Sequence, residues 1–132
     1  MREKDAAPEV ASVTRLIDQS RVDRYGVGGR DHNPIHFDTP EAAKSQFGRP
    51  VAHGMLVLAL VSEAMTKAFG DRWSEGGHLK VRWRAPVLTP ARVTAIANLR
   101  HVEDGVATYD VSCEDENGEV LLAGMARGPI DS

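Results

Sequence analysis

The sequence predicts a single α+β domain in which an antiparallel sheet wraps around one buried helix. Residues 54–69 have helical length, and their first half is apolar on every face. Alternating apolar and polar residues, typical of strands, dominate the chain after this segment. The length of 132 residues, with 42% apolar and 27% charged residues, fits one globular domain. A helix this apolar cannot lie on a surface, so the sheet is expected to cover it.

The N-terminal part is predicted to begin with extended chain followed by a short helix. Residues 1–9 are expected to form a flexible arm, and residues 10–16 form an opening strand or an extended arm. Asp18 is a good N-cap for a helix that continues to about residue 27. The pair Gly28-Gly29 then ends this helix.

Two further helices are predicted before the strands. Thr39 is a cap residue with Pro40 in the first turn, and this short helix ends at about Gly48. The longest helix is predicted from Gly54 to about Phe69. Because its first half is apolar all round, we expect it to be buried on all sides.

The second half of the chain is predicted to form antiparallel strands. Apolar residues alternate with Lys80, Arg82 and Arg84 over residues 79–85, which predicts one buried and one wet face. Asn117-Gly118 is a strong hairpin signal. Further strand-like runs cover residues 91–100, 106–114 and 120–126.

Charge and cysteine content limit the function classes. With 16 basic and 19 acidic residues, the net charge of −3 gives no electrostatic case for nucleic acid or an anionic membrane as partner. The single cysteine, Cys113, excludes an internal disulfide framework and fits a reducing compartment. The charged N-terminus lacks the apolar core of a secretory signal, and the longest apolar run is too short for a membrane span. We therefore expect a cytoplasmic protein.

Catalytic residue types are concentrated just before the longest helix. Asp31 and His36 are close enough in sequence to share one water molecule. Pro34 fixes its own φ and biases Asn33 away from the helical region, so an ordered turn is expected between them. Gly54 opens the helix, whose first backbone N–H groups are free to receive a developing negative charge. An acid/base pair and an oxyanion site within about two dozen residues indicate an enzyme.

The same region matches the pattern of a known family. Residues 25–42 contain an aromatic residue, small residues and the run Asp-His-Asn-Pro-Ile-His, and residues 47–55 read Phe-Gly-Arg-Pro-Val-Ala-His-Gly-Met. Together they closely resemble the MaoC-like dehydratases, which include the (R)-specific enoyl-CoA hydratases. Residues 80–87 resemble the downstream strand of that family, so the match covers roughly residues 15–87.

Two positions depart from the family pattern. Arg30 stands where the family usually has glycine before the catalytic aspartate, and we expect an effect on substrate fit. Residues 89–92, Thr-Pro-Ala-Arg, replace a common Pro-Gly-Asp turn, and we expect an effect on local shape only.

The resemblance implies a hotdog fold, with residues 1–132 as one domain. In such folds an antiparallel sheet curls around a long central helix, here the segment from Gly54. Two chains normally join their sheets edge to edge, so a homodimer is implied. Pairing also covers strand edges that would otherwise promote aggregation.

The implied activity is the reversible hydration of trans-2-enoyl thioesters to (R)-3-hydroxyacyl thioesters. The substrate is carried by coenzyme A or acyl carrier protein, with no cofactor and no metal required. By resemblance, Asp31 accepts the proton of the water and His36 orients or shuttles it, while the Gly54 N–H receives the thioester oxygen. Asn33 and Ser62 are the candidate substrate-binding residues.

Each candidate also has a structural interpretation. Asp31 can cap a turn, Asn33 can brace the loop, and Ser62 can be a helix serine bonded to a carbonyl one turn back. His53 is a scaffold or cap residue more often than an acid/base. The basic residues of the strand at 79–85 either form its solvated face or bind coenzyme A phosphates.

Alternative functions share some of these features. A metal site would use residues among Asp31, His32, His36, Asp38 and His53, but the proline between the first two histidines disfavours the helix on which they would share a face. A hotdog thioesterase would direct water at the carbonyl carbon instead. A non-catalytic acyl-binding or helper subunit would be expected to have lost the aspartate or histidine, and both are present.

Overall fold

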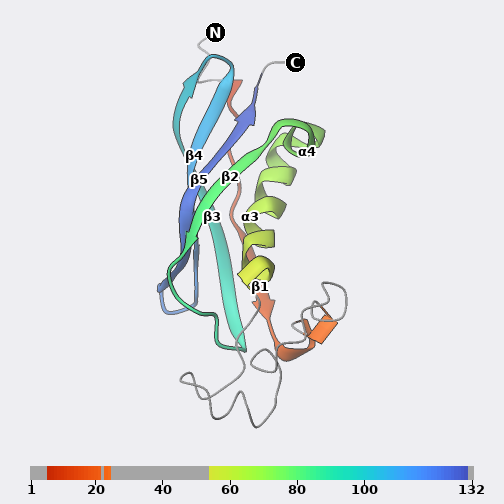
Figure 1. Cartoon of the computed structure of the whole chain (residues 1–132), viewed down its shortest axis with the longest axis vertical. Helices are drawn as coiled ribbons and strands as arrows, with labels where there is room; N and C mark the ends of the chain where they lie inside the picture. The colour runs from red at the N-terminus through yellow and green to blue at the C-terminus, as the bar shows by residue number, and fades with distance from the viewer. Residues whose placement is uncertain (1–5, 22, 25–53, 131–132) are drawn as a thin grey trace.

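The computed structural model describes residues 6–21, 23–24 and 54–130. This part of the chain contains a twisted antiparallel sheet with two helices on one face (Figure 1). Residues 19–21 and 23–24 are helical as well. The elements are β1 (Val13–Ile17), α3 (Gly54–Phe69), α4 (Asp71–Gly76), β2 (His78–Trp83), β3 (Ala91–Glu103), β4 (Val106–Glu114) and β5 (Val120–Pro129).

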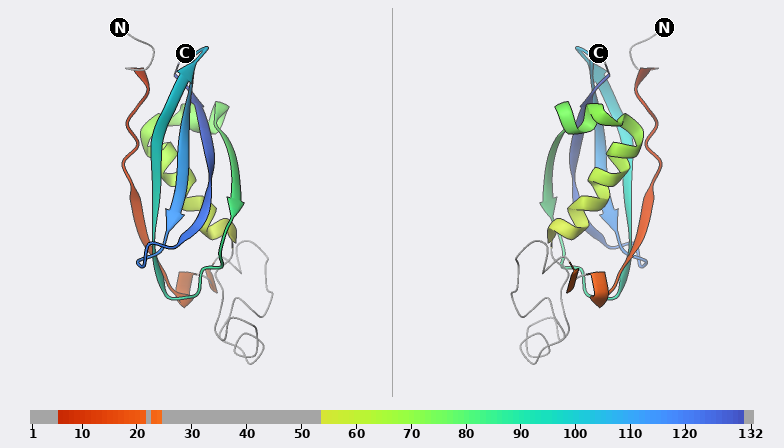
Figure 2. Two further views of the ribbon diagram at one scale, coloured as in Figure 1. Left: turned by 90° about the vertical axis from the view of Figure 1, so that its left-hand side faces the viewer. Right: turned by 90° about the vertical axis from the view of Figure 1, so that its right-hand side faces the viewer.

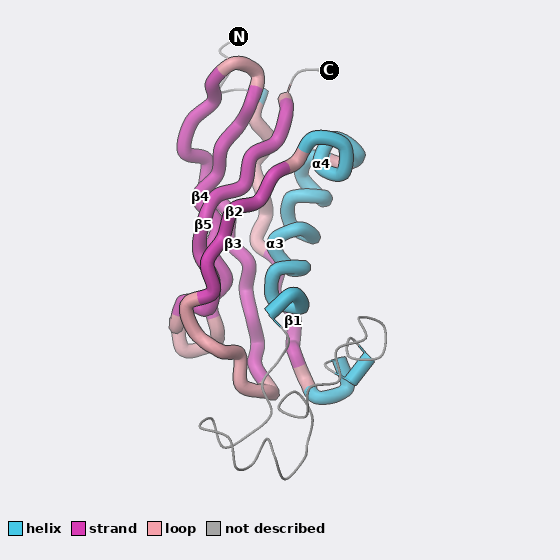
Figure 3. The backbone as a smooth tube through the Cα atoms, viewed as in Figure 1, coloured by secondary structure: helices cyan, strands magenta, loops and turns pink. Residues whose placement is uncertain are grey.

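The five strands are ordered β1-β3-β4-β5-β2, and every neighbouring pair is antiparallel (Figure 3). β3, β4 and β5 form a meander, while β1 and β2 come from earlier in the chain and occupy the two edges. The predicted strand at residues 10–16 is confirmed, although the pairing with β3 covers residues 13–17. The Asp18 cap is also confirmed, because its Oδ1 accepts a hydrogen bond from the Arg21 N–H at 2.9 Å.

Two tight turns connect the meander. Between β4 and β5, the Asp115 carboxylate accepts hydrogen bonds from the backbone N–H groups of Asn117 and Glu119, and Gly118 has a φ of 80°. The Asn-Gly hairpin prediction is therefore confirmed. Between β3 and β4, Asp104 and Gly105 both have positive φ, 52° and 76°, as expected for a type I′ hairpin turn. That Asp-Gly signal explains why β3 extends three residues beyond its predicted end.

α3 begins and ends at the predicted residues and packs its apolar side on the sheet. It contacts β1, β3, β4 and β5 (Figure 2). Val57, Leu60 and Met65 are buried, but Ala59 is exposed and Leu58 is only half-buried. The expectation of burial on all sides is therefore wrong for the single chain. A single sheet covers only one side of a helix, so the other side faces outward.

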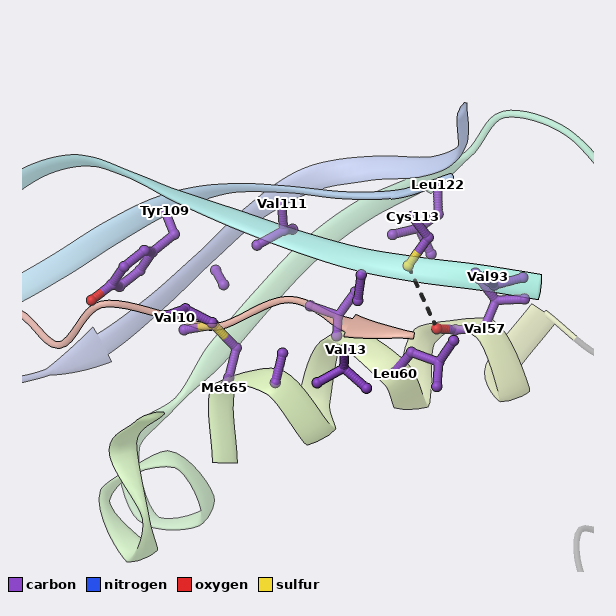
Figure 4. Close-up of a cluster of buried hydrophobic side chains, with 14 of the residues drawn as sticks. Val10, Val13, Val57, Leu60, Met65, Val93, Tyr109, Val111, Cys113 and Leu122 are labelled. Atoms are coloured by element: carbon purple, nitrogen blue, oxygen red, sulfur yellow. Dashed lines mark hydrogen bonds between the residues drawn. The ribbon is translucent and has the colours of Figure 1, made fainter. Parts of the chain in front are cut away.

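The core lies between α3 and the sheet (Figure 4). At one end, the Tyr109 ring meets Phe69 edge-on, with 5.8 Å between ring centroids. The Tyr109 hydroxyl donates a 2.6 Å hydrogen bond to the Pro8 carbonyl, and Val10 is buried in the same core. Residues 6–9 of the predicted flexible arm are thus packed near the core, and residues 1–5 lie outside the described part.

β2 shows the predicted alternation with one exception. Leu79 and Val81 pack against the core, while Lys80 and Arg82 are exposed. Trp83 belongs to the apolar series, yet 49% of its surface is exposed. β2 is an edge strand, and α3 lies mainly over β1, β3 and β4, so among the described elements α3 does not cover this corner of the inner face.

Candidate active site

Three of the predicted site residues, Asp31, Asn33 and His36, lie outside the residues that the structure describes. The same holds for Arg30 and His53. Gly54 and Ser62 are described, and both belong to α3. The structure therefore bears on the helix that is predicted to receive the thioester oxygen.

Gly54 is the first residue of α3, as required for an oxyanion site at a helix start. The first four N–H groups of a helix have no partner within it, and the helix dipole makes this end positive. No acidic residue lies in the first turn, so no nearby helical carboxylate offsets that positive end. Lys67 in the last turn matches the negative end of the dipole. The first turn of α3 is thus electrostatically suited to receive an anion.

The start of α3 is attached to the sheet through the single cysteine. The Cys113 thiol on β4 donates a hydrogen bond to the Val57 carbonyl in the first helical turn, with 3.8 Å between sulfur and oxygen (Figure 4). Cys113 is fully buried, and this burial raises the pKa of its thiol to about 12. The thiol therefore stays neutral and acts as a packing and positioning group, since a nucleophilic cysteine needs a thiolate.

A second attachment joins α3 to β1. Glu63 accepts a hydrogen bond from Arg15 on β1, and Lys67 lies 3.2 Å from the same carboxylate oxygen. All three side chains are partly exposed, so the contribution to stability is small. The cluster lies on the side of α3 that faces β1.

Ser62 has a partner that the sequence did not reveal. Its hydroxyl oxygen accepts a hydrogen bond from the indole N–H of Trp73 at 3.1 Å. Trp73 is buried on α4 and packs against Phe69, with 6.4 Å between ring centroids. Ser62 therefore anchors α4 to α3. Sequence spacing gave no signal for this contact, because it depends on the chain reversal at Gly70.

Within the described ranges, no helix combines the length and apolar character needed to cross a lipid bilayer.

Comparison with known proteins identifies a family match over most of the chain. The model of the MaoC-like domain family matches residues 4–119. The 3-hydroxyacyl-thioester dehydratase Z of Mycobacterium tuberculosis is 35% identical over 92 residues, which cover 67% of this chain and 61% of the relative. The dehydratase X of the same organism is 42% identical over 132 residues, covering 96% and 42% of the two chains. The matched part of this chain thus spans less than two thirds of the length of each of these two relatives.

A solved structure confirms the fold. The (R)-hydratase from Aeromonas caviae, described as involved in PHA biosynthesis, superimposes with a TM-score of 0.80 at 22% identity. The alignment covers 95% of this chain and 96% of the hydratase. The fold is therefore the hotdog fold that the sequence resemblance predicted.

Proposed function

Because this chain belongs to the MaoC-like domain family, we propose that it catalyses the reversible hydration of trans-2-enoyl thioesters to (R)-3-hydroxyacyl thioesters. The observation that carries the proposal is the start of α3 at Gly54, whose first N–H groups have no partner within the helix and whose first turn carries no acidic side chain. Hydration of an enoyl thioester builds negative charge on the thioester oxygen. A helix start is suited to bind that oxygen.

In the proposed mechanism, each catalytic residue acts on a different reacting group. Asp31 accepts one proton from the water while the water oxygen bonds to the β-carbon of the substrate, and His36 orients that water or shuttles the proton. The Gly54 N–H stabilises the enolate oxygen until the proton taken from the water is passed on to the α-carbon. Acid/base groups of this kind contribute about 10²–10⁴-fold each, and an oxyanion donor about 10²–10³-fold.

Asn33 and Ser62 complete the proposed substrate-binding set. Asn33 follows the catalytic aspartate and braces the loop that carries it. Ser62 lies two turns beyond Gly54 on α3, and its hydroxyl already accepts a hydrogen bond from Trp73. A hydroxyl has two acceptor lone pairs and one donor hydrogen, so one contact leaves capacity for a substrate group.

We further propose a homodimer that joins the sheets of two chains through their edges. The partial exposure of the apolar side chains on β2 supports this arrangement, because Trp83 is 49% exposed and Leu79 and Val81 are only partly buried. An edge strand presents backbone N–H and C=O groups that remain available for pairing with another chain. A cytoplasmic location is also proposed, supported by the free thiol of Cys113.

The activity is tested by following the loss of the conjugated enoyl-thioester absorbance with crotonyl-CoA and a longer enoyl-CoA. We expect hydration by the wild type and a loss of about 10²-fold or more in kcat in both Asp31→Asn and His36→Ala. Lys67→Gln, on an exposed position of α3, is the matched control and keeps wild-type activity.

Two outcomes contradict this mechanism. Release of free coenzyme A by the wild type would indicate a thioesterase. Full activity in both the aspartate and the histidine variants would show that these residues do not carry the reaction.

A further inference from the structure

Ser62 on α3 is a hydrogen-bond donor without an acceptor in the described part of the chain. Its hydroxyl oxygen accepts the indole N–H of Trp73 at 3.1 Å. An indole nitrogen can only donate, so this bond leaves the serine hydrogen available. The usual acceptor for a helix serine is the carbonyl one turn back, at Leu58, but Ser62 makes no bond to it within the described residues. The Ser62 hydroxyl can therefore donate to a ligand.

Trp73 is held in place by its contacts with two other residues. Its side chain is buried and packs against Phe69, with 6.4 Å between ring centroids. The chain also passes close to the ring at Gly77, where a Cβ atom would lie 2.3 Å from Cε3 of Trp73. The Gly77 N–H donates to the Trp73 carbonyl at 2.8 Å, at the end of α4. The indole N–H is thus presented to Ser62 from a fixed position.

Ser62 lies on the same row of α3 as the proposed oxyanion site. Gly54, Leu58 and Ser62 are spaced four residues apart, and residues at this spacing form one row along a helix. Glu63 and Lys67 belong to a different row, which faces β1. Leu58 and Ser62 are both half-buried, so parts of their side chains remain accessible. A chain bound at Gly54 can follow this row past the apolar Leu58 to Ser62.

The length of this row decides which part of the substrate meets Ser62. Ser62 comes eight residues after Gly54, about 12 Å along the helix axis at ~1.5 Å per residue. α4, which carries Trp73, lies at the end of α3 remote from Gly54 (Figure 1). An extended chain advances by about 1.2 Å per bond, so roughly ten carbons reach from Gly54 to Ser62. Ser62 would therefore meet the distal part of the acyl chain and not the reacting atoms.

We propose that Trp73 is a positioning residue, which holds the Ser62 hydroxyl as a donor toward an oxygen atom on the acyl chain. This inference rests on the proposed hydratase function and names its substrate class. The class consists of enoyl thioesters whose long chain carries a carbonyl or hydroxyl oxygen roughly ten carbons from the thioester. A hydrocarbon chain would leave the donor unpaired. Loss of the indole N–H would let Ser62 rotate toward the Leu58 carbonyl instead.

The test compares trans-2-dodecenoyl-CoA with analogues that carry a keto oxygen on the tenth or the sixth carbon. A keto oxygen can only accept, so it reports on a donor at the position that it reaches. For the tenth-carbon analogue, we expect kcat/KM relative to the plain chain to fall about fivefold in Ser62→Ala and in Trp73→Phe. Thr66→Ala removes an exposed hydroxyl one turn further along α3 and should keep the wild-type ratio.

Further readouts distinguish positioning from a purely structural role. The loss should appear in KM rather than in kcat, because the contact is made equally in the ground state and the transition state. The double variant Ser62→Ala/Trp73→Phe should lose no more of the preference than either single variant, since both changes remove the same contact. Ser62→Thr keeps a hydroxyl and should retain most of the preference. The sixth-carbon analogue should show no preference in any variant.

A binding experiment separates this inference from the proposed function. Dodecanoyl-CoA with or without the keto oxygen on the tenth carbon cannot be hydrated, so calorimetry measures its affinity without turnover. We expect the wild type to bind the keto analogue about fivefold more tightly, and Ser62→Ala and Trp73→Phe to bind both equally. This preference in a protein that hydrates no substrate would overturn the proposed function and support the contact with Ser62.

Other results would overturn the inference itself. An unchanged preference in Ser62→Ala would show that the hydroxyl does not contact the chain, and an unchanged preference in Trp73→Phe would show that the indole does not position it. Crotonyl-CoA is too short to reach Ser62. If Trp73→Phe lowered its hydration by the same factor as that of the keto analogue, the tryptophan would support the fold of α3 and not this contact.

Discussion

At the scale of single residues, Tyr109 on β4 connects its strand to α3 and to the N-terminal segment. Its ring packs edge-on against Phe69 of α3, and its hydroxyl is bonded to the Pro8 carbonyl in the N-terminal segment. Burial of the side chain raises the pKa of its phenol to about 12, from an ordinary value of 10.0. The folded protein therefore favours the neutral phenol.

This shift predicts loss of stability at alkaline pH. Between pH 10 and pH 12, the unfolded chain releases the Tyr109 proton while the folded chain retains it, so unfolding becomes more favourable as the pH rises. We expect Tyr109→Phe to cost about 1 kcal/mol at pH 8, because the bond to Pro8 is lost. It should also flatten the decline in stability above pH 10. Urea unfolding at several pH values measures both effects, and an unchanged slope would contradict the burial argument.

At the scale of elements, a hydrogen bond from Trp73 to Ser62 joins α4 to α3, beside the packing of Trp73 on Phe69. Ser62→Ala leaves the buried Trp73 N–H without an acceptor, and we expect a loss of about 1 kcal/mol in the free energy of unfolding. Trp73→Phe removes the donor itself. In the Trp73→Phe background, Ser62→Ala should lower the free energy of unfolding by clearly less than it does in the wild type, because no buried donor is left without an acceptor. Urea unfolding of the two single variants and the double variant provides the cycle, and strictly additive losses would show that the bond contributes nothing.

The elements differ in how well their sequences predict them. α3 was predictable to the residue because a glycine opens it and its first half is continuously apolar. β3 was predicted too short, because a register irregularity between Leu99 and His101 breaks the alternation before the strand ends. The exposure of Trp83 could not be predicted, since it depends on where the helix lies over the sheet. Burial of a strand face is a property of the assembly of elements, not of one strand.

The same distinction holds for the candidate site. Gly54 was predictable because a helix start follows from local sequence. The bond from Trp73 to Ser62 was not, because it depends on the path of the chain between two helices. The roles of Asp31, Asn33 and His36 remain predictions from motif and family, and the variants proposed above test the two catalytic ones.

At the scale of the whole molecule, the two sheet edges offer a direct test of the proposed dimer. Leu16 on β1 and Trp83 on β2 are large apolar residues with similar exposure, 45% and 49%. They lie on opposite edges of the sheet. We expect Trp83→Glu to shift the particle mass from two chains towards one, because charge at this position opposes pairing through β2.

Leu16→Glu serves as the matched control and should leave the mass at two chains. Light scattering over a range of concentrations provides the measurement. A wild type with the mass of one chain, or equal dissociation in both variants, would contradict a dimer joined through β2.

The position of β1 also determines when the fold can be completed. Neighbouring strands of the β3-β4-β5 meander are joined by short turns, and such local contacts form at low entropic cost. The pairing of β1 with β3 instead joins residues far apart in the chain, such as Thr14 and Thr94, whose hydroxyls lie 2.8 Å apart. During synthesis, β1 leaves the ribosome before β3 and cannot make its pairing in the sheet until β3 follows. The earliest of the described strands is therefore one of the last to find its place in the sheet.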